Sequence, residues 1–395
     1  MIQKARLVRA IKEEYRQLEK AVRHTPLVRT SLGIPDLPAT VYLKLENFQK
    51  TGSFKVRGAL AKLRSLSQGD RKNGVVSASA GNHAQGVAWA ARLLGIRAAI
   101  VMPENASLAK QKATQSYGAE VILSGKNFEE AFSFAQALSQ SEKKPFIHAF
   151  DDERIIAGQG SLGIEILKDL PEVSAVFIPV GGGGLAAGIG VYMKSVRPSI
   201  KVIGVRAKAK NSVRSLYPPI ADGIAVKRMG SLTGPLLESC LDEVITVSEE
   251  EISSAIFLLL ERRKIIAEGA GASSVAGYLK AFRRFENHQA VLLISGGNID
   301  VTLIEKILER GLVKAGRLFR FQLEVDDAPG KLSEITRLIA EEKANILHVV
   351  HDRYSLHIPL YKTRIEFSLE TKGPGHILEI KRKLRKAGYQ ISAVS

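Results

Sequence analysis

Short, almost entirely apolar runs alternate with helix-like segments along most of the sequence. The runs lie at residues 74–78, 98–102, 120–123, 175–178, 202–205 and 290–294. A strand that is apolar on both faces is typical of a parallel sheet covered by helices, so an α/β fold is expected. In such sheets ligands bind beyond the carboxyl ends of the strands, and those ends are where functional motifs are expected.

The segment 41–59 contains an apolar strand, a break at Gly52 and the start of a helix. Ser53 is placed to cap this helix, and Lys55 falls in its first turn. A positive charge at the N-terminal end of a helix is disfavoured, so Lys55 is expected to lose its proton more readily than a solvated lysine. A lysine that forms a Schiff base needs this property. Taken alone, Lys55 could also be a surface charge beside a turn.

A second motif follows the strand at 74–78. Its members are Ser79, Ala80, Gly81, Asn82 and His83. Small residues leave backbone N–H groups open at a helix start, which suits a carboxylate. Alternatively, the segment is a strand-to-helix turn that binds no ligand. His83 could likewise be a partly buried, hydrogen-bonded side chain with no catalytic function.

Four glycines follow the strand at 175–178 and precede a helix. They are Gly181, Gly182, Gly183 and Gly184, with Leu185 next. Such a loop can curl around a phosphate, with its N–H groups and the helix dipole directed at the anion. The same letters satisfy a relaxed dinucleotide fingerprint, and Arg206 stands where an NADP site would carry an arginine. That alternative leaves the Lys55 segment unexplained.

The strand at 290–294 ends in a fourth motif, Ser295-Gly-Gly-Asn298, which alone indicates only a turn. The four motifs, in this order, resemble the threonine dehydratase family of pyridoxal-phosphate enzymes, whose fold is shared with serine racemase and the tryptophan synthase β chain. Segments 150–161, 220–228 and 267–272 are similar too, and the similarity covers nearly all of residues 20–310. It implies an α/β catalytic domain over residues 1–315, with two parallel-sheet lobes and pyridoxal 5'-phosphate as cofactor.

The resemblance implies roles for individual residues, with Lys55 as the catalytic one. The implied cofactor-binding residues are Phe54, Lys55, Asn82 (at the phenolic oxygen), Gly181, Gly182, Gly183, Gly184, Leu185 and Ser295 (at the pyridine nitrogen). The implied substrate-carboxylate residues are Ser79, Ala80, Gly81, Asn82 and His83. A neutral serine hydroxyl does not hold the pyridine nitrogen protonated, which favours elimination or racemisation over transamination. Glu268 lies near the cofactor by the same analogy.

Residues 206–210 depart from the pattern of serine racemases, which carry an acidic residue there as part of a divalent-cation site. Here the segment reads Arg-Ala-Lys-Ala-Lys, and its positive charge opposes a metal ion. We therefore expect no metal at this position, which also argues against a racemase. Asp151 and Asp152 are expected to be helix caps or solvated charges.

The character of the sequence changes after Gly311. Strands are predicted at 317–325, 345–350, 361–369 and 389–393. One helix is predicted between the first two strands, ending near residue 342, and a second helix at 375–387, which gives a ferredoxin-like order. Residues 316–395 resemble an ACT domain, a small amino-acid-sensing module. The residues that match its ligand loop are Asp327, Pro329, Gly330, Leu332 and Asn345. The alternative is a dimerisation sheet without a ligand.

The net charge of +17, from 57 basic and 40 acidic residues, raises the possibility of a nucleic-acid partner. The basic residues are spread along the chain, however, and the densest cluster, at 381–386, has the spacing of a solvated helix face. A single cysteine, Cys240, rules out an intramolecular disulfide framework, and early charges argue against a signal peptide. The longest uncharged run, 173–193, contains Pro179 and the four glycines, so it predicts strand, loop and helix rather than a membrane span.

Together with the resemblance to the threonine dehydratase family, these patterns lead us to expect a cytoplasmic enzyme that dehydrates L-threonine, and also L-serine, to a 2-oxo acid and ammonia. Lys55 would hold the cofactor and then act as base, and the cofactor phosphate would act as acid. Relatives imply a homodimer or homotetramer, and a branched-chain amino acid is the expected effector. No nucleic-acid or membrane partner is expected. The remaining alternatives are a serine racemase, a 3-hydroxyaspartate dehydratase and a non-catalytic amino-acid sensor.

Overall fold

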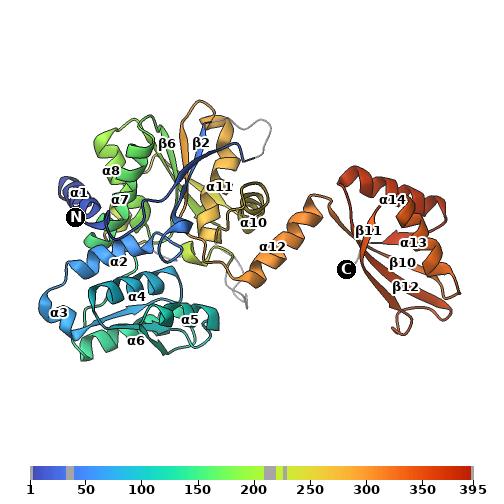
Figure 1. Cartoon of the computed structure of the whole chain (residues 1–395), viewed down its shortest axis with the longest axis horizontal. Coiled ribbons are helices and arrows are strands. Elements are labelled where there is room, and N and C mark those ends of the chain that lie inside the picture. Colours follow the sequence, from blue (N-terminus) through green and yellow to red (C-terminus); the bar gives the residue numbers. More distant parts are fainter. Residues whose placement is uncertain (1–2, 33–39, 209–218, 226–228, 393–395) are drawn as a thin grey trace. The chain divides into compact units, whose positions relative to one another are not determined.

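The computed structural model of the protein describes residues 3–32, 40–208, 219–225 and 229–392. The chain divides into two compact units, Met1–Ile299 and Asp300–Ser395 (Figure 1). Each is described by itself.

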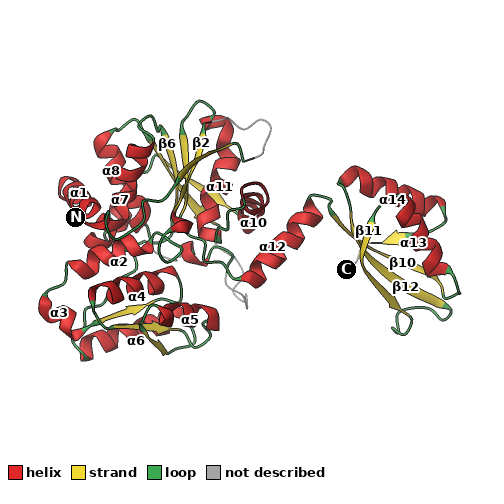
Figure 2. Cartoon of the chain, in the orientation of Figure 1, coloured by secondary structure: helices red, strands yellow, loops and turns green. Residues whose placement is uncertain are grey.

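The larger sheet of the first unit has six strands, all parallel to their neighbours except the antiparallel pair β1 and β2. In spatial order the strands are β1 (Leu27–Thr30), β2 (Val41–Leu45), β9 (Ala290–Ile294), β6 (Ala175–Pro179), β7 (Lys201–Ala207) and β8 (Glu243–Val247). The central strands β6 and β9 are buried at every position, because helices cover both faces of the sheet (Figure 2). This is the reason that their sequences are apolar without alternation.

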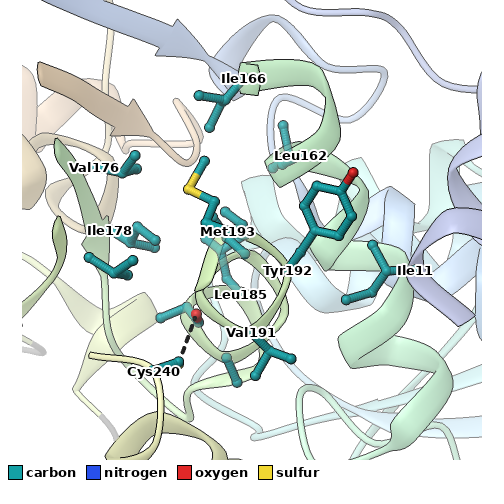
Figure 3. Packing of buried hydrophobic residues seen from close by; sticks show 14 of the residues in the cluster. Ile11, Leu162, Ile166, Val176, Ile178, Leu185, Val191, Tyr192, Met193 and Cys240 are labelled. Carbon is teal, nitrogen blue, oxygen red and sulfur yellow. Dashed lines mark hydrogen bonds between the residues drawn. The ribbon is translucent and has the colours of Figure 1, made fainter. Parts of the chain in front are cut away.

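The helices around this sheet begin with α1 (Lys4–Leu18). The others are α7 (Glu153–Asp169), α8 (Gly184–Val196), α9 (Thr233–Glu238), α10 (Glu249–Leu258) and α11 (Gly269–Ala281). Helix α8 packs closely on α7, since a Cβ added at Gly188 would lie 2.5 Å from the Ile156 carbonyl oxygen. Figure 3 shows its Met193 among Val176 and Ile178 of β6 and Ile166 of α7.

The uncharged run 173–193 is therefore β6, the glycine turn and α8, all in the core, which confirms the prediction of strand, loop and helix. None of the helices in the described part of the chain combines the length and apolar character needed to cross a bilayer.

The smaller sheet of the first unit has three parallel strands, β3 (Val75–Ala78), β4 (Ala98–Met102) and β5 (Glu120–Leu123). The helices of this lobe are α2 (Lys55–Arg64), α3 (Gln68–Asn73), α4 (Asn82–Leu94), α5 (Leu108–Ser116) and α6 (Phe128–Ser141). Helices α4 and α6 contact β3 from opposite sides (Figure 1). The prediction of an α/β fold with two parallel-sheet lobes is confirmed.

The second unit is an antiparallel sheet with helices. Its elements are α12 (Val301–Lys314), β10 (Leu318–Asp326), α13 (Lys331–Glu341), β11 (Asn345–Asp352), β12 (Lys362–Glu370), α14 (Pro374–Lys386) and β13 (Ile391–Ser392), with spatial strand order β11-β12-β10-β13. From β10 onward this is the predicted strand-helix-strand-strand-helix-strand order. Helix α12 contacts β10 and belongs to the second unit, which begins at Asp300.

Candidate active site

Lys55 is the first residue of α2, and the residue before it, Phe54, occupies the capping position without a side-chain hydrogen bond. The prediction that Ser53 caps this helix is therefore wrong. Ser53 instead forms a β-bridge with Gly296, at the end of β9, and its buried hydroxyl has no hydrogen-bond partner among the described residues. Tertiary pairing with β9 overrides the local capping preference.

The Lys55 side chain is half-buried, and its Nζ donates a hydrogen bond to the Ala149 carbonyl oxygen at 2.9 Å. Burial lowers the pKa of Lys55 to about 8, although the nearby Glu268 carboxylate acts in the opposite direction. The lowered proton affinity is the one that the sequence predicts, but burial rather than the helix end is its main cause. A substantial fraction of this amine is neutral just above neutral pH.

The loop at residues 79–83, here called the carboxylate loop, leads from β3 into α4. Gly81 occupies the capping position of α4 and provides no side-chain hydrogen bond to the first turn, so the helix start keeps free N–H capacity. Ser79 Oγ accepts a hydrogen bond from Gly81 N at 3.1 Å. The loop thus has a defined shape that can receive an anion at the helix start.

His83 is buried, and its Nε2 lies 3.0 Å from the Ile147 carbonyl oxygen. Burial, with the adjacent Lys55 charge, lowers the pKa of His83 to about 3. The imidazole is therefore neutral and hydrogen-bonded, which agrees with the alternative of a satisfied, buried histidine side chain.

Asn82 connects the two lobes. Its Nδ2 donates a hydrogen bond to Glu268 Oε1 at 2.7 Å, and its Oδ1 accepts one from Asn298 Nδ2, also at 2.7 Å. Asn298 in turn donates to the Thr51 carbonyl oxygen at 2.8 Å. The motif at 295–298 was identified from the sequence, but the function of Asn298 in orienting Asn82 was not.

The glycine loop, residues 181–184, joins β6 to α8. Gly183 has a φ of +95°, which a side chain would strain, and a Cβ added at Gly182 would lie 2.2 Å from the Phe150 ring. Thr233 Oγ1 donates a hydrogen bond to the Gly182 carbonyl oxygen at 2.7 Å. Leu185, the next residue, is buried in the first turn of α8. The loop lies at the N-terminal end of α8, where backbone N–H groups can bind a phosphate.

Asp151 supports the glycine loop from outside. Its two oxygens accept hydrogen bonds from the N–H groups of Ser231, Leu232 and Thr233, at 2.9, 2.9 and 3.1 Å. Burial alone would raise the pKa of Asp151, but these hydrogen bonds hold it below its ordinary value. Asp152 caps α7, since its Oδ1 accepts from Arg154 N at 2.8 Å. The expectation that these residues are helix caps or solvated charges is confirmed for Asp152, whereas Asp151 binds backbone N–H groups of the segment that leads into α9.

The four strand-end motifs meet in the structure. Ser295 is buried after β9, and its carbonyl oxygen accepts a hydrogen bond from Phe54 N at 3.1 Å, beside Lys55. The segment that contains Ala149 and Phe150 touches both Lys55 Nζ and the glycine loop. One site therefore combines the lysine, the carboxylate loop, the glycine loop and Ser295.

A buried ionic network lies two residues beyond Lys55, and the sequence analysis missed it. Arg57 donates two hydrogen bonds of 2.8 Å to Glu46 and one of 2.6 Å to Glu165. Lys44 Nζ lies 2.9 Å from Glu165 and 3.0 Å from Asp169. Burial alone would lower the pKa of Arg57, but the carboxylates of Glu46 and Glu165 raise it above its ordinary value. The network ties α2 to β2 and α7.

In the described part of the chain, no cluster of three or more histidine, cysteine or acidic side chains could hold a metal ion. Ala209 and Lys210, from the segment on which the prediction of no metal was based, lie outside the described residues.

In the second unit, four of the five predicted effector residues lie at one end of the sheet, in the turn from β10 to α13 and the start of that helix. They are Asp327, Pro329, Gly330 and Leu332. Asn345 pairs with Glu370, which also pairs with Leu318 at the start of β10. It therefore lies at the opposite end, roughly 27 Å away along nine-residue β10.

Three comparisons with known proteins bear on this site. Residues 18–296 match the family model described as pyridoxal-phosphate dependent enzyme. An L-threonine ammonia-lyase of Thermotoga maritima is 46% identical over 395 residues, covering 97% of this chain and 98% of that protein.

The solved structures that are similar in fold include the following two. The processed form of threonine deaminase isoform 2 from Solanum lycopersicum has a TM-score of 0.70 and 34% identity, covering 76% of this chain and 92% of its own. Maize serine racemase has a TM-score of 0.69 and 29% identity, covering 78% and 98%.

Proposed function

Since the chain belongs to the pyridoxal-phosphate-dependent enzymes, we propose that it converts L-threonine to 2-oxobutyrate and ammonia and also converts L-serine to pyruvate and ammonia. The observation that supports this most is the meeting of four strand-end motifs around the Lys55 amine. The extent of similarity to the Thermotoga L-threonine ammonia-lyase, over nearly both whole chains, favours threonine as substrate.

The residues fit pyridoxal 5'-phosphate. A partly neutral Lys55 amine suits an aldehyde, and a glycine loop at the N-terminal end of α8, with Gly183 at a positive φ, suits a phosphate. The orphaned Ser53 hydroxyl, buried between Lys55 and Gly296, indicates that a polar partner belongs there. We assign the cofactor to Phe54, Lys55, Asn82, residues 181–185 and Ser295.

When bound, the cofactor supplies a carbonyl that links to the substrate amine and a ring that makes the α-proton acidic. The residues of the protein carry out the other steps. The carboxylate loop holds the substrate carboxylate at the open start of α4, through residues 79–83. Lys55, neutral in part because burial lowers its pKa to about 8, takes the α-proton at Nζ as general base. Ser295 provides an uncharged neighbour for the ring, which favours elimination.

The substrate proposal has a direct test. Purified protein loaded with pyridoxal 5'-phosphate is expected to release 2-oxobutyrate from L-threonine and pyruvate from L-serine, measured as keto acid by coupled dehydrogenase assay. L-Alanine, which has no leaving group on its β-carbon, is the matched control and should give none. A panel that includes 3-hydroxyaspartate, with chiral analysis of recovered serine, separates the alternative dehydratase and racemase activities. Keto acid from none of the hydroxy amino acids would contradict the proposal.

We further propose that residues 1–315 catalyse the reaction in the cytoplasm and that residues 316–395 form a regulatory ACT domain. The fold order of β10 to β13 and the positive φ of +88° at Gly330 support this assignment. Exposed apolar residues on the edge strand β11, including Leu347 and Val350, support pairing with a second copy in a homodimer or homotetramer.

The regulatory proposal predicts that a branched-chain amino acid changes turnover. Isoleucine or valine, titrated into the threonine assay, is expected to shift the half-saturating threonine concentration several-fold. In a chain truncated after Gly316 the same titration should have no effect. An unchanged saturation curve with both amino acids in the full chain would leave residues 316–395 as a dimerisation sheet without an effector.

A further inference from the structure

Glu268 is a buried acidic residue to which the proposed mechanism gives no role. It occupies the capping position of α11, the whole residue is only 9% exposed, and its backbone N–H donates to the Gly296 carbonyl oxygen at 3.0 Å. A Cβ added at Gly296 would lie 2.5 Å from Glu268 Oε1, so the carboxylate is closely confined on that side. An acidic group at a helix start is electrostatically favoured there.

The orientation of Asn82 fixes the hydrogen bond to Glu268. The Thr51 carbonyl oxygen can only accept, so Asn298 must direct its Nδ2 toward it. That same Nδ2 donates to Asn82 Oδ1, which leaves Asn82 Nδ2 to face Glu268. A reversed Asn82 amide would place its oxygen against the carboxylate and its NH₂ against another NH₂. The geometry therefore holds the Glu268 carboxylate in one place at the seam between the lobes.

The charged groups that act on Glu268 come from three other elements. They are Lys55 of α2, Lys110 of α5 and Asp222 of the short 3-10 turn Asp222–Ile224. Lys110 Nζ lies 3.1 Å from Asp222 Oδ2, so these two largely offset each other. Burial raises the pKa of Glu268 to about 7, whereas the Asn82 N–H and Lys55 lower it. Backbone hydrogen bonds bring the two groups to the same turn: the Glu268 N–H donates to the Gly296 carbonyl oxygen, and the N–H of Phe54, the residue before Lys55, donates to the Ser295 carbonyl oxygen. Glu268 is in turn the charge that raises the pKa of Lys55 against burial.

We propose that Glu268 is a positioning residue for the reaction: held by Asn82, it places a carboxylate that acts on the Lys55 nitrogen and sets how firmly that nitrogen holds its proton. The inference rests on the proposed function only in taking Lys55 as the reacting amine. The ionised carboxylate stabilises a positive charge at Lys55, and the neutral carboxyl does not. Removing the charge should therefore release the proton at lower pH.

The test compares wild type with Glu268→Gln and Asp222→Asn as substrate-free holoenzymes. Glutamine keeps an acceptor for Asn82 Nδ2 but carries no charge, and Asp222→Asn removes a nearby carboxylate that does not contact Asn82. The absorbance of the bound cofactor, followed against pH, should titrate about one pH unit lower in Glu268→Gln and at the wild-type position in Asp222→Asn. The acid limb of kcat/KM for threonine should move by the same amount.

Titration curves that superimpose for wild type and Glu268→Gln, or an equal shift in Asp222→Asn, would overturn the proposal. If Glu268→Gln yields no folded holoenzyme, Glu268→Ala takes its place in the same absorbance titration. A Glu268→Ala curve that superimposes on the wild-type curve would equally overturn the proposal. The absorbance experiment needs no substrate. A shifted curve in an enzyme inactive on threonine would therefore contradict the proposed function but not the role of Glu268.

Discussion

Replacing Lys55 with alanine is expected to lower the rate of keto-acid formation from threonine at least about 10³-fold. The variant loses the amine that would hold the cofactor and also the base that would take the α-proton. Its fold should persist, since the half-buried Lys55 side chain forms a hydrogen bond with the Ala149 carbonyl and has no buried ion pair with any described residue. Steady-state assay of the purified variant, with circular dichroism to verify folding, measures the loss.

Lys50→Ala provides the matched control, because Lys50 is an exposed lysine five positions earlier, before the helix. Its rate should stay within about twofold of wild type, as is usual for an exposed position. A Lys55→Ala enzyme that keeps a tenth or more of the wild-type rate would remove the lysine from the mechanism. Borohydride treatment of the wild-type holoenzyme, followed by peptide mass analysis, should label Lys55 and gives an independent check.

Replacing Arg57 with leucine is expected to lower the free energy of unfolding of the first unit by about 3–5 kcal/mol. The guanidinium is fully buried and forms hydrogen bonds with Glu46 and Glu165, so its removal leaves buried carboxylates without their main partner. Urea unfolding followed by the fluorescence of Trp89, the single tryptophan, measures the change, since Trp89 lies on α4 of this unit.

Arg6→Leu is the control for an ion pair at the surface. Arg6 lies 3.0 Å from Glu153, but its side chain is 74% exposed, so its removal should cost at most about 1 kcal/mol. If Arg6→Leu and Arg57→Leu lowered the free energy of unfolding by the same amount, the result would contradict the argument that the buried ion pairs contribute more than the exposed one.

The difference in the free energy of unfolding between wild type and Arg57→Leu should also depend on pH. Burial alone would raise the pKa of Glu165, but Arg57 and Lys44 hold it below the ordinary value of 4.5. The resulting stabilisation is present above pH 4.5 and is lost as the pH falls through the lower folded-state pKa. The free energies of unfolding of wild type and Arg57→Leu should therefore become more similar at acid pH.

Much of the fold could be predicted because its strands are buried on both faces and bounded by small residues. The predicted strand at 98–102 has the same limits as β4, and the strand at 290–294 the same limits as β9. The site followed from the same feature, since the motifs stand at the carboxyl ends of parallel strands and those ends converge.

The errors and omissions arose where distant segments meet. Ser53 has the local sequence of a cap, but its pairing with Gly296, far along the chain, decides its position. Arg57 and Glu165 are more than a hundred residues apart, and charged side chains are seldom fully buried, so nothing local marks them as partners. Asn345 was grouped with Asp327 by family pattern, yet β10 and β11 both run antiparallel to β12 and so separate the two residues by the length of the sheet.

Helix α2 has ten residues and contains both the amine assigned to the chemistry and, two positions later, the guanidinium at the centre of the ionic network. Loosening this helix would break the buried ion pairs that join it to Glu46, just after β2, and to Glu165 of α7, so it has little freedom to melt while the rest of the unit remains intact. On heating, loss of activity and unfolding of the first unit should therefore occur together. A substitution that strengthens the ion pairs of Arg57 should for the same reason also slow the thermal inactivation of the enzyme.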